Sequence, residues 1–349
     1  MSELLIDVHI IDAGRLNITT VSRGFEVLSG DKRNTVNQNR LNVSATSGIV
    51  QINSARYTNR VVLTARSPIR INEIDYDGEI HLIAHDKNQI RVINRIYIEN
   101  YLKSVISAEM GGHSPLEALK SQAVAARTIS LSKIAAKKHI NEGYDLCNTT
   151  HCQVYKGLTG ITQTAMNAVM QTNNMILVYN GKPIEACYSS HCGGITECAG
   201  NVWLSRQEYL ISQPDSYCIN ASLIPNWNQR SINWEVNFSK KEIENLFGVR
   251  NLKEILIIAR YASTRVETIT IKASRDVTLN GPTEIRNRFN LPSTLFIITR
   301  NNDNFLFVGN GYGHGVGMCQ TGAIARAKAG KNFKEILNFY YINVSIVEI

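Results

Sequence analysis

One carboxylate stands at the end of a helical stripe of apolar residues. The members of this stripe recur at helical spacing and are Ile98, Tyr101, Leu102, Val105 and Ile106. The next position on the same face is Glu109, so the pattern places a carboxyl group among apolar neighbours. Burial disfavours the charged form of a carboxyl and raises its pKa, as a general acid near neutral pH requires. The alternative is that the helix frays and Glu109 turns into solvent.

An arginine interrupts the apolar face of the next predicted helix. Ser114, Pro115 and Glu117 form a helix start of the S-x-x-E type, with proline at the first helical position. Further along, Arg127 falls on the apolar face, and a buried arginine needs a partner. Pairing with Glu109 would lower the pKa of that acid. Pairing elsewhere or binding substrate would leave the acid intact, and a structural arginine that holds loop carbonyls is an equal alternative.

Two thiols and an imidazole lie within six residues, at Cys147, His151 and Cys152. Zinc binds cysteine sulfur and histidine nitrogen in a tetrahedron, so this segment predicts two or three metal ligands. A disulfide between Cys147 and Cys152 is the competing interpretation. The residues that could complete a metal site are His139, Cys187, His191, Cys192 and Cys198.

Two further segments combine small polar residues with glycine. Ser189 and Ser190 follow a predicted strand and precede a pair of glycines, which suits a loop whose backbone approaches a ligand. Residues 309–317 carry five glycines at alternate positions around His314. This spacing predicts an extended strip that packs tightly or lines a cleft. It does not match the glycine patterns of nucleotide-binding loops, and the chain has no H-E-x-x-H zinc peptidase motif.

Strands and helices must together position these side chains. We predict an α/β protein of the mixed α+β kind, with a helical catalytic core flanked by β-rich lobes. Its parts are an N-terminal β-rich lobe over 1–95, the core over 96–230, an inserted α+β lobe over 231–308, and a glycine-rich loop with C-terminal helices over 309–349 that complete the core. Among the elements, we expect strands at 61–64, 69–71, 79–83, 89–93, 175–179, 183–188, 234–238, 255–260, 268–273 and 294–299, helices from 98, 115, 162, 239, 323 and 333, and a loop over 29–38.

The composition is that of a folded, basic protein. The 349 residues carry a formal net charge of +8, so polyanions are plausible partners. Lysine and arginine are scattered, and no nucleic-acid recognition motif accompanies them, so we predict no nucleic-acid partner. No apolar run reaches the roughly 18 residues of a membrane span. The N-terminus does not read as an export signal. We therefore expect a protein that either stays inside the cell or has its export signal or anchor outside this sequence.

Several segments together resemble the stage II sporulation protein D family, also called the SpoIID/LytB domain. The similar segments are 101–110 (YLKSVISAEM), 115–128 (PLEALKSQAVAART), 145–157 (DLCNTTHCQVYKG), 188–190 (YSS), 193–197 (GGITE) and 313–318 (GHGVGM). They occur in the family's order and span about 90–215 and 309–341.

The resemblance implies a lytic transglycosylase that cleaves the bond between N-acetylmuramic acid (MurNAc) and N-acetylglucosamine (GlcNAc) in peptide-free peptidoglycan strands. Glu109 would act first as acid and then as base, and the products would be 1,6-anhydro-MurNAc ends. This chemistry needs one carboxylate because no water is activated. Zinc at Cys147, His151 and Cys152 would be structural and is not required for the chemistry. The residues expected to line the glycan cleft are Lys120, Gln122, Arg127, Ser189, Ser190 and His314.

The same resemblance suggests a role in cell-wall remodelling during sporulation or division, in the cell envelope, with an amidase acting beforehand to remove peptides. A different class of function is a non-catalytic, glycan-binding modifier of a cell-wall amidase, and a zinc hydrolase is a third. The chain also departs from the family pattern. Gly111 replaces a proline, Ser114 a tryptophan, and Cys319 and Thr321 a serine and a tryptophan, while Cys187, Cys192 and Cys198 are also atypical. Two lost tryptophans remove surface on which sugars could stack.

Overall fold

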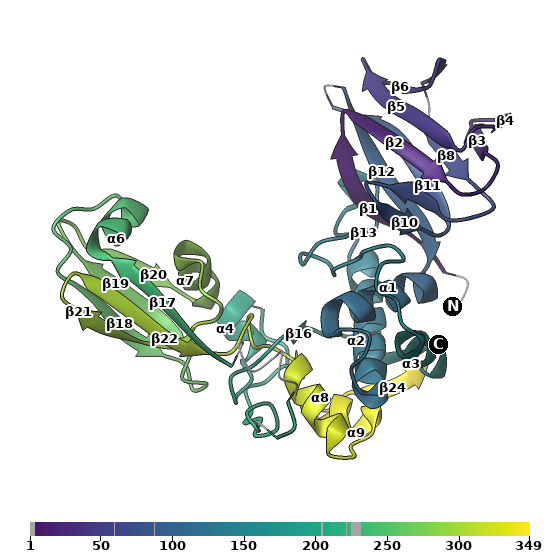
Figure 1. The fold of residues 1–349 in the computed structure, drawn as a ribbon. Helices are drawn as coiled ribbons and strands as arrows, with labels where there is room; N and C mark the ends of the chain where they lie inside the picture. The colour runs from purple at the N-terminus through teal and green to yellow at the C-terminus, as the bar shows by residue number, and fades with distance from the viewer. Residues whose placement is uncertain (1–3, 59, 87, 204, 221, 225–231) are drawn as a thin grey trace. The chain divides into compact units, whose positions relative to one another are not determined.

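The computed structural model describes residues 4–58, 60–86, 88–203, 205–220, 222–224 and 232–349. The chain forms two compact units. The first unit comprises Met1–Ile176, Pro183–Glu185 and Val347–Ile349, and the second comprises Leu177–Lys182 and Ala186–Ile346. Both units contain strands and helices (Figure 1), which confirms the predicted mixed α+β class.

The first unit is built on two antiparallel-rich sheets. One has the strand order β13-β1-β12-β11-β8-β3-β4 and the other β10-β9-β2-β5-β6-β7. Exposed and buried residues alternate along strands such as β5, as expected where one face of a sheet covers a core. The strands are β1 (Leu5–Ala13), β2 (Arg15–Thr20), β3 (Phe25–Ser29), β4 (Lys32–Val36), β5 (Arg40–Thr46), β6 (Ile49–Ile52), β7 (Ala55–Tyr57), β8 (Val61–Thr64), β9 (Ile69–Ile71), β10 (Ile74–Tyr76), β11 (Glu79–His85), β12 (Gln89–Tyr97) and β13 (Leu146–Cys147).

The predicted loop over 29–38 is wrong, because β4 pairs with β3 as a hairpin within it. Four of the five residues of β4 are exposed and the fifth is half-buried. An edge strand with both faces toward solvent has no apolar alternation to reveal it.

Three helices of the first unit follow the strands. They are α1 (Ile98–Met110), α2 (Leu116–Ala135) and α3 (Gln163–Gln171), and a short 3-10 turn, η1 (Ile140–Glu142), precedes β13. The start of α1 is confirmed at Ile98. The predicted capping box at Ser114 is wrong, because Pro115 occupies the N-cap position and makes no side-chain cap. The Ser114 hydroxyl instead donates a hydrogen bond to the Met110 carbonyl, 2.7 Å away, at the end of α1.

The second unit has an α+β portion with its own apolar core. Two three-stranded sheets, β17-β22-β21 and β18-β19-β20, pack with α6 and α7 around buried residues that run from Trp234 to Phe307. The capping box that opens α6 is confirmed, with Ser239 and Glu242 bonding each other's backbone. The elements of this unit are β16 (Tyr188–Ser189), α4 (Ala199–Trp203), β17 (Asn233–Ser239), α6 (Lys240–Phe247), β18 (Glu254–Arg260), β19 (Val266–Lys272), β20 (Val277–Asn280), α7 (Pro282–Phe289), β21 (Leu295–Asn301), β22 (Asn304–Asn310), β23 (Met318–Cys319), α8 (Gln320–Lys328) and α9 (Phe333–Tyr340).

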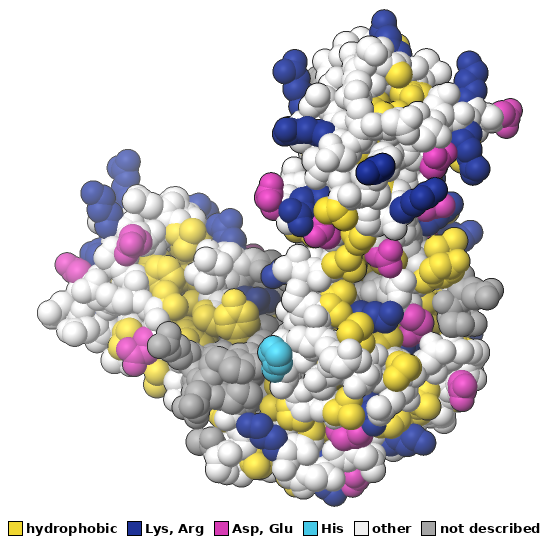
Figure 2. Space-filling model, turned by 45° about the vertical axis from the view of Figure 1, so that its right-hand side comes forward, with side chains coloured by type: hydrophobic (Ala, Val, Ile, Leu, Met, Phe, Trp, Pro, Cys, Tyr) yellow, Lys and Arg dark blue, Asp and Glu magenta, His cyan; other side chains and the backbone are white. Residues whose placement is uncertain are grey.

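The chain passes between the units within three short strands, β14 (Met175–Tyr179), β15 (Lys182–Pro183) and β24 (Ser345–Glu348). The strand expected over 183–188 is not continuous, since β15 ends at Pro183 and β16 begins at Tyr188. Across the described ranges, no helix combines the length and apolar character needed to cross a membrane. Lysine and arginine side chains are spread over the visible face rather than gathered in one patch (Figure 2).

Candidate functional site

Glu109 lies in the last turn of α1, as the apolar stripe predicted. Its neighbours on that face, including Val105 and Ile106, are fully buried, whereas Glu109 itself is half-buried. The backbone N–H of Val154 donates a hydrogen bond of 2.8 Å to Glu109 Oε1. The carboxyl group is thus held at Oε1 on a residue that is half-buried.

The segment that carries Val154 is fastened to the helices of the first unit at several points. The N–H of Lys156 donates to Ser104 Oγ of α1 at 3.1 Å. The amide of Gln153 donates to Ser130 Oγ of α2 at 2.6 Å. These bonds hold Gln153, directly before Val154, and Lys156, two residues after it, so the segment's position relative to Glu109 depends on the packing of α1 and α2.

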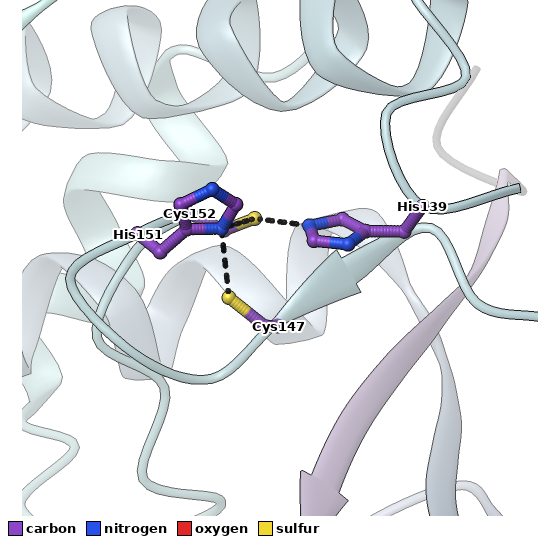
Figure 3. A group of neighbouring side chains, drawn as sticks. All are labelled: His139, Cys147, His151 and Cys152. Atoms are coloured by element: carbon purple, nitrogen blue, oxygen red, sulfur yellow. Dashed lines mark hydrogen bonds between the residues drawn. The ribbon is translucent and has the colours of Figure 1, made fainter. Parts of the chain in front are cut away.

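Four potential metal ligands converge just before that segment. The side chains of His139, Cys147, His151 and Cys152 point toward one another (Figure 3), and their ligand atoms all lie within 4.8 Å of each other. His139 is the member that completes the group. Cys147 stands on β13, which pairs in parallel with β1. The carbonyls of His151 and Cys152 both accept hydrogen bonds from the Lys133 ammonium, at 2.9 Å each.

Two of the three sulfur-to-nitrogen distances in this group fall in the range expected around a tetrahedral zinc ion, and the third is slightly shorter. Ligands at zinc bond lengths lie about 3.3–3.8 Å from one another. The Cys147 Sγ to His151 Nδ1 distance is 3.6 Å, the Cys152 Sγ to His151 Nδ1 distance is 3.8 Å, and the Cys152 Sγ to His139 Nε2 distance is 3.2 Å. The other ring nitrogen of His139 lies 2.5 Å from a Glu142 carboxylate oxygen, the outer partner that metal-bound histidines usually have.

The chemical state of the two thiols in this group also favours metal binding. Cys147 and Cys152 are free thiols, and no disulfide joins them. A hydrogen bond from the Cys152 thiol lowers the pKa of Cys147 to about 3. The same hydrogen bond raises the pKa of Cys152. Of the two thiols, Cys147 is therefore the one that more readily becomes a thiolate, the form that binds zinc.

Arg127 of α2 points into the first unit rather than to its surface. It is 1% exposed, and its guanidinium makes two hydrogen bonds of 2.7 Å to the two carboxylate oxygens of Glu99 at the start of α1. Its remaining terminal nitrogen donates to the Met175 carbonyl at 3.0 Å. This geometry supports the alternative in which Arg127 is structural. It also means that Arg127 pairs with a carboxylate other than Glu109.

The other predicted cleft residues of α2 differ in exposure. The Lys120 ammonium lies 2.6 Å from the carboxylate of Glu117, and its side chain is 14% exposed. Gln122 is fully buried. Of these two residues, Lys120 is thus the one that solvent reaches.

Ser189, Ser190 and His314 belong to the second unit, where the structure brings them together. A Cβ added to Gly313 would lie 3.0 Å from the Cβ of Ser189, so the glycine allows the 309–317 strip to approach β16 closely. The Ser190 carbonyl accepts a hydrogen bond from the Thr321 hydroxyl at 2.9 Å.

His314 is half-buried, and its Nδ1 accepts the N–H of Val316 at 3.0 Å. Desolvation lowers its pKa to about 4, so the ring is neutral near pH 7. No sequence pattern predicted which residue would lie beside this ring. Trp203, 41% exposed, meets His314 edge-on with 4.8 Å between ring centres. The two residues are far apart in the chain, so spacing could not have paired them.

Comparisons with known proteins agree with the motifs. A family model described as stage II sporulation protein matches residues 86–179, and a model described as a domain of unknown function matches 225–317. An uncharacterised protein of Brachyspira hyodysenteriae is 34% identical over 84% of this chain and 77% of its own length. The stage II sporulation protein D of Bacillus subtilis is 30% identical over 73% of this chain and 76% of its own. The amidase enhancer of Bacillus subtilis is 31% identical over 69% of this chain but only 39% of its own length.

Proposed function

Because the chain belongs to the stage II sporulation protein family, we propose that it acts on the bacterial cell wall as a lytic transglycosylase of peptidoglycan. The observation that carries this proposal is the position of Glu109, half-buried at the end of α1 and anchored at one oxygen by the Val154 N–H. The chain would work in the cell envelope, on glycan strands from which an amidase has removed the peptides.

The reaction needs one group that first gives and then takes a proton. The carboxyl of Glu109, held at Oε1 by the Val154 N–H, supplies the acid proton. That proton goes to the oxygen between MurNAc and GlcNAc as the bond from this oxygen to MurNAc C1 breaks. The resulting carboxylate then takes the proton of the muramyl 6-hydroxyl while O6 bonds to C1 and closes the 1,6-anhydro ring. No water is consumed, so no second carboxylate is required.

We also propose that His139, Cys147, His151 and Cys152 hold a structural zinc ion. A bound ion would supply a cross-link across this segment and no chemistry of the sugar. The segment that the four residues fix leads directly to Val154, which bonds Glu109. The ligands would therefore act on the reaction by positioning the acid.

Within the first unit, we propose that Lys120, the more exposed of the predicted cleft residues Lys120 and Gln122, contacts the polar groups of the glycan strand. Within the second unit, taken by itself, the exposed Trp203 lies beside His314, and we propose that it offers a face for sugar packing. Gln122 and Ser189 are buried in their respective units, so we propose no direct glycan contact for them.

Digestion of purified, peptide-free glycan strands tests the proposal. The wild-type protein should release products with 1,6-anhydro-MurNAc ends, detected by mass spectrometry, and Glu109→Gln should release none. Glu73→Gln is the matched control, because it makes the same change at an exposed position of the first unit. Retained cleavage in Glu109→Gln, or hydrated rather than anhydro ends, would overturn the proposed chemistry.

The similarity to the amidase enhancer favours a second function, a glycan-binding protein that stimulates an amidase without cutting strands itself. In that case the wild type and Glu109→Gln would bind peptide-free strands equally and release nothing. Both would raise the rate at which a cell-wall amidase removes peptides from intact peptidoglycan.

A further inference from the structure

A second group of cysteines lies in the interior of the second unit, apart from the residues assigned above. Cys192, Cys218 and Cys319 are each fully buried, together with the carboxylate of Asp215. The three sulfurs and one oxygen of this buried cysteine group lie within 4.8 Å of one another. The Cys192 and Cys218 sulfurs are 3.2 Å apart, and the Cys192 sulfur is 3.7 Å from Asp215 Oδ2.

Tertiary structure assembles this group from three distant segments. β16 and β23 pair in parallel, with Ser189 opposite Cys319, and this pairing brings Cys192 to the start of α8. Asp215 and Cys218 come from the irregular segment that follows α4. Three thiols from separate parts of the chain thus meet at one buried point.

The surroundings of the sulfurs suit thiolates. The N–H groups of Cys192 and Gly322 donate to the Cys319 sulfur at 3.2 and 3.4 Å, and the N–H of Gly194 donates to the Cys218 sulfur at 3.2 Å. Cys319 is also the N-cap of α8, where the helix dipole favours negative charge. Backbone donors aimed at sulfur strengthen when the sulfur is charged.

Buried thiolates need a cation, and the two nearby arginines bond the carboxylate and backbone carbonyls of this region rather than the sulfurs. Arg326 is paired with Asp215 Oδ1 at 2.9 Å, and the Tyr340 hydroxyl donates to Asp215 Oδ2 at 2.6 Å. Arg265 donates to the carbonyls of Cys192 and Ile195, at 2.6 and 3.0 Å. A fully buried negative charge without a partner is costly. An ion bound by the sulfurs would provide the compensation.

We propose that Cys192, Cys218 and Cys319 bind a zinc ion, with Asp215 Oδ2 as the fourth ligand. Sulfur-rich sets select soft metals, and a closed set of four protein ligands is typical of a structural zinc. The 3.7 Å between Asp215 Oδ2 and Cys192 Sγ falls within the about 3.3–3.8 Å expected between tetrahedral zinc ligands. The sulfurs of Cys192 and Cys218 are closer together and would separate by about 0.5 Å around an ion.

The ion would join the β16–β23 pair, the start of α8 and the 215–218 segment. Close approach is built into the site, since a Cβ on Gly322 would lie 2.3 Å from Asp215 Oδ2. The proposal does not depend on catalysis by Glu109, because it concerns the stability of the second unit.

Metal content of protein purified under non-oxidising conditions tests the site. The decisive variant is Cys147→Ser with Cys152→Ser, which leaves the buried cysteine group untouched. It should retain one zinc ion per chain by mass spectrometry of the metals, and after exchange it should bind one Co²⁺ with the intense visible bands of tetrahedral thiolate coordination. No zinc and no such Co²⁺ spectrum in this variant would overturn the proposal.

A second pair of variants locates the ion. Cys218→Ser with Cys319→Ser should lower the zinc content of the wild type by one ion per chain. Cys187→Ser with Cys198→Ser is the matched control, because these two cysteines belong to neither ligand group, and it should leave the content unchanged. Peptide mapping that finds a Cys192–Cys218 disulfide in the wild type purified in this way would also refute the site, whatever the outcome for Glu109.

Discussion

The buried ion pair between Arg127 and Glu99 allows a direct test of the structural role of Arg127 in the first unit. Glu99→Gln removes the charge that the guanidinium faces but keeps the shape of the side chain. Removing one partner of a buried pair costs about 3–5 kcal/mol, because an uncompensated charge stays inside. Glu99 is 14% exposed, so some solvent reaches the pair. We therefore take the lower end of this range, a loss of about 3 kcal/mol in the free energy of unfolding. For a unit of this size, each kcal/mol shifts Tm by about 2–4 °C, so the expected decrease is about 6–12 °C.

Calorimetry measures this change, and Asp75→Asn provides the comparison. Asp75 accepts the same kind of bidentate hydrogen bonding from Arg70, with both contacts at 2.8 Å. The side chains are more exposed, however, at 38% for Asp75 and 48% for Arg70. Exposed pairs contribute little, so this variant should melt close to the wild type. Equal Tm values for Glu99→Gln and Asp75→Asn would refute the structural role of Arg127 and return it to the candidates for substrate binding.

Three further predictions follow from the geometry. Gly157→Ala should lower the Tm by more than Gly160→Ala in thermal melts. Both glycines have positive φ, but only at Gly157 would a Cβ meet a backbone oxygen, that of Asp75 at 2.3 Å. Equal decreases in Tm would contradict this reasoning. The folded-state pKa of His314, about 4, lies below its ordinary 6.5, so the unfolded chain binds the proton first and acidification from about 6.5 to 4 costs stability. His314→Gln should therefore lose less Tm than the wild type between pH 7 and pH 5, and parallel curves would rule this out. Cys147→Ser with Cys152→Ser should release one zinc ion and cut glycan cleavage although Glu109 is intact, and full activity in the zinc-free variant would show that the ligand group does not position the acid.

Local signals in the sequence were sufficient for much of the fold. The start of α1 at Ile98 and the capping box at Ser239 depend on residues within one or two turns, and both are confirmed. The same signal failed at Ser114, because its hydroxyl found a partner in Met110. A serine hydroxyl can cap a helix only if it does not bond another backbone group nearby. Whether the motif forms a cap therefore depends on the carbonyls at the end of the preceding helix.

In the candidate site, too, the residues close in sequence could be predicted and the partners brought together by folding could not. The spacing of Cys147, His151 and Cys152 pointed to three of the four side chains that converge in the structure, since all three come from one short segment. His139 was one option among several until the fold set it against Cys152, at 3.2 Å. The partner of Arg127 could not be chosen from the sequence either, because it depends on how α1 and α2 pack.

Separation along the chain did not predict which cysteines lie together. Cysteines close in sequence are divided between the units, and a distant cysteine joins one of the groups. Six of them crowd between 147 and 218, which suggests one cluster, yet the chain changes units between 176 and 186 and divides them. Cys319 looks isolated in the sequence, yet it lies against Cys192 through the β16–β23 pair. These two cysteines converge with Cys218 on one buried point. Their convergence is the reason to expect a ligand there rather than three separate core thiols.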